Sequence, residues 1–116
     1  MRVLVSCLVT AVAVGSAYSA AACEPPAPVA VPDGKTSTME QMLAGQAEIK
    51  VYQTKMNEFV ACIDAEADAQ GEKAPEEFKS LMIARHNAAV AEMEGVAQAF
   101  NDQIKAYRAA NPAPAN

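Results

Sequence analysis

Apolar side chains recur at helical spacing along two long stretches of the chain, separated by a short polar segment. In the first stretch, residues 37–70, the main series has the seven-residue spacing typical of coiled coils: Met42, Ile49, Met56 and Ile63. In the second, residues 75–110, one stripe continues over the whole length: Phe78, Met82, Arg85 or His86, Ala89, Met93, Val96, Phe100, Ile104 and Tyr107. The pattern predicts two long helices. Because the loop between them has only a few residues, they must be antiparallel.

Short signals in the sequence mark where these helices begin and end. Ser37 is expected to cap the first helix, with Glu40 reaching back to it in a capping box. Gly71 fits the position just past the end of that helix. Pro112 stops the second helix, so residues 112–116 are expected to form a disordered tail.

A proline-rich segment precedes the first helix. Residues 23–36 contain four prolines, which exclude a helix and favour extended polyproline II. This arm spans up to about 43 Å when extended, enough to run back along the roughly 37 Å of helix that leads to Cys62. We therefore predict an arm that lies antiparallel to the first helix. Its Val29 and Val31 would cover Val51 and Ala44.

Reflecting the sequence about the loop predicts which residues face each other across the hairpin. The predicted pairs are Ile63–Met82, Phe59–His86, Met56–Ala89, Tyr52–Met93, Ile49–Val96, Gly45–Phe100 and Met39–Tyr107. A large side chain faces a small one in the pairs Met56–Ala89 and Gly45–Phe100. This agreement between pattern and volume supports the hairpin.

Residues 1–22 have the features of a secretory signal peptide. Arg2 supplies the positive charge, Val3–Val14 is almost wholly apolar, and Ala20-Ala21-Ala22 fits a cleavage site of small residues. An N-terminal membrane anchor is the alternative, but the apolar run is too short to span a bilayer comfortably. We expect cleavage after residue 22, no membrane insertion afterwards, and a periplasmic or secreted protein.

The cysteines leave two chemistries open at the new N-terminus. Cys7 is removed with the signal peptide, which leaves Cys23 and Cys62. An even count in a small exported domain predicts a Cys23–Cys62 disulfide. Alternatively, Cys23 is lipidated and tethers a cell-envelope lipoprotein, although Ala20 stands where a lipoprotein signal prefers Leu. The two chemistries exclude each other, because a lipidated Cys23 cannot form the disulfide. The disulfide is favoured because lipidation would leave Cys62 as an unpaired thiol in an oxidising compartment.

Composition and charge narrow the class of function. The 116 residues allow one small domain. Acidic residues outnumber basic ones by 14 to 9, and the net charge is −5. Without Arg2 the charge becomes −6, from 8 basic and 14 acidic side chains. This balance argues against nucleic-acid binding. With only three Phe, three Tyr and no Trp, the chain cannot wall a deep active-site pocket.

We expect no catalytic residues, no cofactor and no metal ion. His86 is the only histidine, and beside Phe59 it is expected to be a packing residue. Methionine thioethers bind Cu(I), which leaves a periplasmic metal-handling protein as a weaker alternative. The five methionines after Met1 all lie on the predicted helix seam, however, where methionine fills gaps. An acidic cluster near the loop lacks the loop of a tight Ca²⁺ site: Asp64, Glu66, Asp68 and Glu72.

A second apolar line on the second helix lies beside the main stripe. Its members also have seven-residue spacing: Ile83, Val90, Ala97 and Ile104. A hairpin alone leaves one side of each helix uncovered. The line is therefore either covered by the arm or a candidate partner surface, for an unknown protein partner or for self-association.

Short motifs in the first half of the chain resemble a group of short exported proteobacterial proteins of unknown function. The motifs are Cys23-Glu-Pro-Pro, Val31-Pro32-Asp33-Gly34, Glu40-Gln-Met42, Val51-Tyr52 and Phe59-Val-Ala-Cys62. The resemblance covers about residues 1–66. It implies export, a framework of two cysteines and a helical body, and it carries no catalytic residues.

The sequence therefore predicts an all-α protein. The expected fold is an antiparallel two-helix hairpin, residues 37–111, with an extended proline-rich N-terminal arm disulfide-linked to the first helix. The expected role is non-enzymatic, that of an exported binding or structural module that acts through a helix face.

Overall fold

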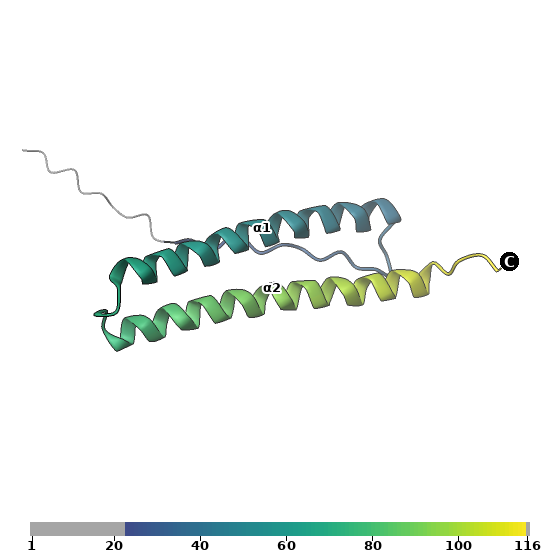
Figure 1. The fold of residues 1–116 in the computed structure, drawn as a ribbon. Helices are drawn as coiled ribbons and strands as arrows, with labels where there is room; N and C mark the ends of the chain where they lie inside the picture. Colours follow the sequence, from purple (N-terminus) through teal and green to yellow (C-terminus); the bar gives the residue numbers. More distant parts are fainter. Residues whose placement is uncertain (1–22, 116) are drawn as a thin grey trace, which may run out of the picture.

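Two long helices form the body of the molecule. A computed structural model of the protein describes residues 23–115, and the predicted signal peptide lies outside the described residues. Helix α1 comprises Met39–Gln70 and helix α2 comprises Glu76–Ala110, and the described range contains no strand. The helices run antiparallel and side by side (Figure 1). The prediction of an all-α hairpin is confirmed.

The capping box of α1 lies one residue later than predicted. Thr38, not Ser37, is the N-cap: its Oγ1 accepts a hydrogen bond from the backbone N–H of Gln41 at 3.1 Å. The Gln41 side chain in turn accepts one from the backbone N–H of Thr38 at 2.8 Å. Both pairs, Ser37–Glu40 and Thr38–Gln41, satisfy the capping-box pattern. A turn precedes the helix, and in this turn the N–H of Ser37 donates to the carbonyl of Asp33. Ser37 therefore belongs to the turn, and Thr38 is the cap.

The connection between the helices is a short turn with one glycine that requires its conformational freedom. Gly71 has a φ of 70°, and its N–H donates to the carbonyl of Asp68, which ends α1. Ala74 is buried in the turn. Pro75 is the N-cap of α2, and Glu76 and Glu77 follow in the first turn, where the positive end of the helix dipole favours acidic side chains.

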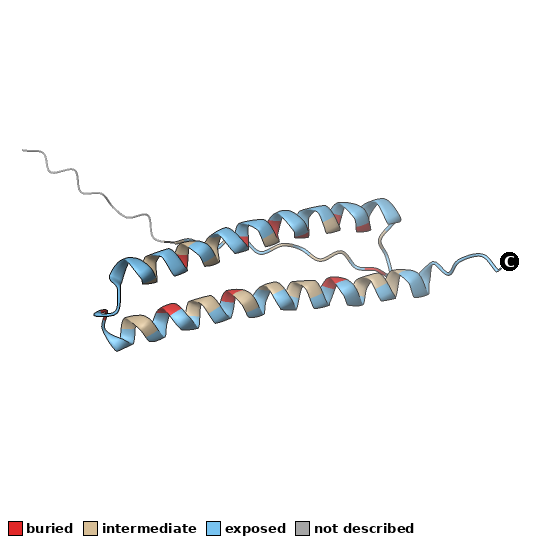
Figure 2. Ribbon diagram, in the orientation of Figure 1, coloured by how far each residue is buried: buried red, intermediate tan, exposed pale blue. Residues whose placement is uncertain are grey.

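The core lies along the facing sides of the helices, where Figure 2 shows the buried positions. The first cluster of buried side chains is Met42, Ile49 and Phe100, with Val29, Val31, Val96, Ile104 and Tyr107 packed against it. The second is Tyr52, Met56 and Ala89, with Val29, Phe59, Val60, Met93 and Val96 against it. The clusters join several predicted partners, including Met56 with Ala89. The heptad series Met42, Ile49, Met56 and Ile63 is buried throughout.

The arm occupies the groove between the two helices (Figure 1) and does not cover the outer face of α1. Val29 packs against both core clusters, and each cluster has residues from both helices. Val51, which the arm was predicted to cover, remains 54% exposed, and Ala44 is also exposed. The arm runs antiparallel to α1 as predicted, but the predicted cover of Val51 and Ala44 by Val29 and Val31 was wrong. Helical periodicity shows which residues share a face, but it does not show on which side of the helix a third segment packs.

Two glycines make room for the arm. A Cβ on Gly45 would lie 2.7 Å from Cγ of Pro32, so the missing side chain accommodates the proline ring. Gly45 was predicted to face Phe100, and the structure places the arm against it. Gly34 is buried against the backbone of α2 at Gln103, and its N–H donates to Oε1 of that residue at 2.9 Å. The arm is therefore a third element of the core.

Within the described range, neither helix combines the length and the apolar character that crossing a bilayer requires.

Candidate functional site

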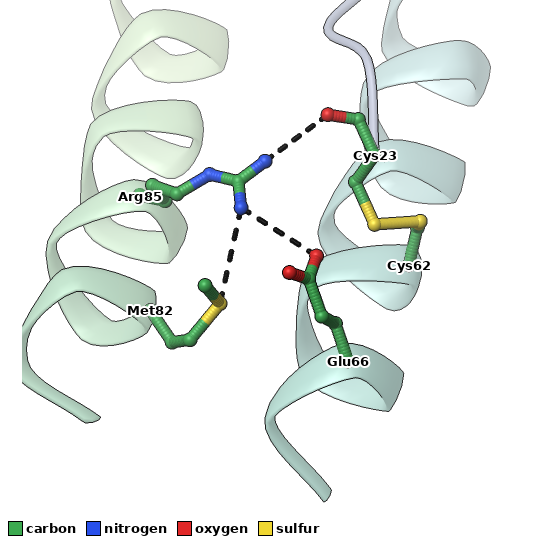
Figure 3. A network of polar contacts seen from close by, with 5 residues as sticks. All are labelled: Cys23, Cys62, Glu66, Met82 and Arg85. Carbon is green, nitrogen blue, oxygen red and sulfur yellow. Dashed lines mark hydrogen bonds and ion pairs between the residues drawn. A yellow bond between two sulfur atoms is a disulfide. The ribbon is translucent and has the colours of Figure 1, made fainter. Parts of the chain in front are cut away.

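The disulfide and an arginine together fix the start of the arm. Cys23 is bonded to Cys62, with their Cα atoms 5.8 Å apart, which confirms the predicted bridge to α1. From α2, Nη2 of Arg85 donates a hydrogen bond to the carbonyl oxygen of Cys23 at 3.0 Å (Figure 3). The first residue of the arm is thus linked covalently to one helix and by a hydrogen bond to the other.

Arg85 makes further contacts that sequence reasoning did not predict. Its Nη1 lies 3.6 Å from a carboxylate oxygen of Glu66 and 3.9 Å from Sδ of Met82 (Figure 3). The guanidinium also lies 5.9 Å from the centroid of the Phe59 ring, within the range of a cation–π contact. Its position on the main stripe of the second helix was a signal, because a charged residue there needs a partner at the seam.

The predicted pairing of Phe59 with His86 gives way to a polar contact. Nδ1 of His86 lies 2.9 Å from Oδ1 of Asp64, and Arg85 takes the place over the Phe59 ring. His86 is half-buried and borders a small hollow near the loop together with Ile83 and Met82. It joins the two helices as a surface contact.

A buried tyrosine links the middles of the two helices. The hydroxyl of Tyr52 donates a hydrogen bond to a carboxylate oxygen of Glu92 at 2.7 Å. Burial, followed by the hydrogen bond to Glu92 and the negative charge of its carboxylate, raises the pKa of Tyr52 from 10.0 to about 12. The phenol is therefore neutral at ordinary pH and serves as a structural donor.

The candidate partner surface is the apolar line on α2, and its exposure to solvent is greatest at the Ile83 end. Ile83 is 62% exposed, whereas the other three residues are half-buried: Val90, Ala97 and Ile104. Ile104 also packs against the core cluster of Met42, Ile49 and Phe100. The four residues extend over about 32 Å of the helix, and the structure leaves the Ile83 end most open.

An apolar hollow lies at the end of the hairpin away from the loop. It has a volume of about 180 Å³, and we call it the open-end hollow. Both helices line it: Met39, Met42, Leu43 and Gln46 from α1, and Phe100, Ile104, Tyr107 and Arg108 from α2. Met39 and Leu43 at its rim are 55% and 56% exposed. Met39 was predicted to lie in the helix seam, but it lies at this exposed rim. Leu43 is an apolar residue next to the stripe, and this position could have indicated the hollow from the sequence.

The remaining methionines behave as packing residues. Met42, Met56 and Met82 are buried and Met93 is half-buried in the core. Over residues 23–115, no three His, Cys, Asp or Glu side chains gather closely enough to hold a metal ion. What the arrangement offers chemically is apolar contact along α2 and at the open-end hollow.

In comparisons with known proteins, no protein-family model, no curated protein and no solved structure matches the chain. The resemblance to short exported proteobacterial proteins stays a prediction.

Proposed function

We propose that the chain is an exported, non-enzymatic helical module that associates through the apolar line on α2. The partner that best fits the line is a second copy of the same helix. Seven-residue spacing brings the same face of a helix to the surface every two turns, and two such faces pack against each other as in a coiled coil. Symmetric pairing through one shared patch is also the commonest form of soluble oligomer.

The observation that carries the proposal is the exposure of Ile83. The core is filled by the inner faces of the helices and by the arm, and yet Ile83 stays 62% exposed at the start of a regularly spaced apolar line. The arm does not cover this end of the line, since it begins at Cys23 beside Arg85 and runs away from the loop. Burying Ile83 against a second copy would remove its side chain from water.

Export is supported by two independent features. The apolar leader predicted over residues 1–22 directs secretion, and the Cys23–Cys62 bridge is of a kind that persists in oxidising compartments outside the cytoplasm. The bridge also uses the sulfur that lipidation of Cys23 would need. We therefore favour a free exported module over the lipoprotein.

The test is the mass of the protein in solution, measured by size-exclusion chromatography with light scattering. We expect a dimer for the wild type and a monomer for Ile83→Asp, because a charge at the interface between the two copies must be desolvated on association. Ala84→Asp is the matched control: it adds the same charge at the next, also exposed, position and should remain dimeric. A monomeric wild type, or equal effects of the two substitutions, would contradict the proposal.

A further inference from the structure

Half-buried side chains recur at every third position along residues 23–32 of the arm. Cys23, Pro26, Val29 and Pro32 are half-buried, and apart from the half-buried Val31 the residues between them are exposed: Glu24, Pro25, Ala27, Pro28 and Ala30. A polyproline II helix has three residues per turn, so residues three apart share a face. We call Cys23, Pro26, Val29 and Pro32 the inner ridge of the arm.

The groove beneath the inner ridge is shaped for such a segment. Val29 lies where side chains of both helices meet, because it packs against both core clusters. The Pro32 ring fits against Gly45, where even a methyl group would be too close. Small apolar side chains and proline rings at every third position therefore match the floor of the groove.

Hydrogen bonds attach the arm to the helices at its two ends only. Arg85 donates to the carbonyl of Cys23, and the N–H of Gly34 donates to Gln103. Between these ends, in the part of the chain that the structure describes, residues 24–32 make no hydrogen bond to either helix. Apolar contact and the covalent bridge therefore hold the middle of the arm in the groove.

The bridge lies beside a depression in the protein surface. Cys23 and Cys62 are both half-buried and line a surface depression of about 430 Å³. Glu24, Pro26, Lys55, Glu58 and Phe59 complete its walls. A thiolate on a small molecule or on an exposed loop can approach the sulfurs from this side, as thiol–disulfide exchange requires.

We propose that the groove between α1 and α2 is a binding site for extended proline-rich segments, that the arm is its resident occupant, and that the Cys23–Cys62 bridge controls access. A dithiol reductant opens the site. One thiolate attacks a bridge sulfur to give a mixed disulfide, and the second thiolate then displaces the remaining cysteine. The reductant leaves as a cyclic disulfide, and Cys23 and Cys62 are left as two thiols. The freed arm then gives way to a partner segment with the same three-residue spacing.

The test uses the chain from Cys23 onward and a fluorescent synthetic peptide of residues 24–36 as the probe, followed by fluorescence anisotropy. Both protein forms carry Val29→Asp, which weakens the apolar contact of their own arm and leaves the bridge to hold it over the groove. One form retains the bridge, and the other carries Cys23→Ser and Cys62→Ser. We expect the unbridged form to bind the peptide saturably and about tenfold or more tightly than the bridged form, because a tethered segment competes at a high effective concentration.

Two altered peptides are the matched controls. A peptide with Val29→Asp, on the inner ridge, should lose binding, and a peptide with Ala30→Asp, on the exposed side, should retain it. Equal binding of these two peptides, or no binding to the unbridged form, would overturn the proposal. Loss of the helical circular dichroism signal in the unbridged form would also overturn it, because the arm would then be indispensable to the hairpin. None of these results depends on association through Ile83, so this proposal and the dimer proposal fail separately.

Discussion

At the scale of single residues, polar contacts between the helices decide how the apolar surfaces meet. Arg85 joins the start of the arm to Glu66, and Tyr52 joins the buried middle of α1 to Glu92. Each contact spans two elements far apart in sequence. Periodicity identified Tyr52 as a core residue, but it did not predict the carboxylate that accepts its hydrogen bond, because Glu92 lies outside the apolar stripe.

Burial of Tyr52, together with its hydrogen bond to Glu92, makes the free energy of unfolding depend on pH in the alkaline range. The pKa of Tyr52 is raised from 10.0 to about 12 in the folded protein, so folding favours the protonated phenol. This contribution is therefore fully present below pH 10 and is lost as the pH rises toward 12. We expect the free energy of unfolding in urea to fall over this range in the wild type. Tyr52→Phe removes the titrating group, and a parallel fall in that variant would show that Tyr52 is not the cause.

At the scale of elements, the sequence was sufficient to predict the bounds of the helices but not the packing position of the arm. The predicted helices, residues 37–70 and 75–110, agree closely with Met39–Gln70 and Glu76–Ala110, since their apolar stripes are long and regular. The position of the arm depends on close packing at Gly34 and Gly45. An isolated glycine within a helix pattern signals close approach of something, but the pattern does not identify the neighbour.

Glycine substitutions test the position of the arm directly. A Cβ on Gly34 would collide with the backbone carbonyl of Gln103, whereas a Cβ on Gly95 meets nothing within 4 Å. We expect Gly34→Ala to lower the free energy of unfolding by about 1–3 kcal/mol, because the turn must move and its hydrogen bond is strained. Gly95→Ala should raise it by about 0.5–1 kcal/mol through helix propensity. Denaturation in urea measures both, and a neutral Gly34→Ala would mean that the arm does not pack there.

At the scale of the whole molecule, the arm and its bridge convert a two-helix hairpin into a three-part core. The bridge closes a loop between residues separated by 39 positions, for which a stabilisation of about 3–4 kcal/mol is expected. The cysteine count was sufficient to predict the pair, because removal of Cys7 with the predicted signal peptide leaves only one intramolecular pairing. The groove that the arm enters depends on packing in three dimensions and has no signature in the pattern. For the open-end hollow, the pattern offers only Leu43, an apolar residue next to the stripe.

We propose that the protein is exported and that Cys23 becomes a bridged N-terminus. The measurement is the intact mass of the protein recovered from the cell envelope of its own host, before and after reduction and alkylation. We expect the mass of residues 23–116 less two hydrogens, with both cysteines alkylated only after reduction. A mass increased by a diacylglycerol and an acyl chain, with Cys62 alkylated without reduction, would contradict it and identify a lipoprotein tethered through Cys23.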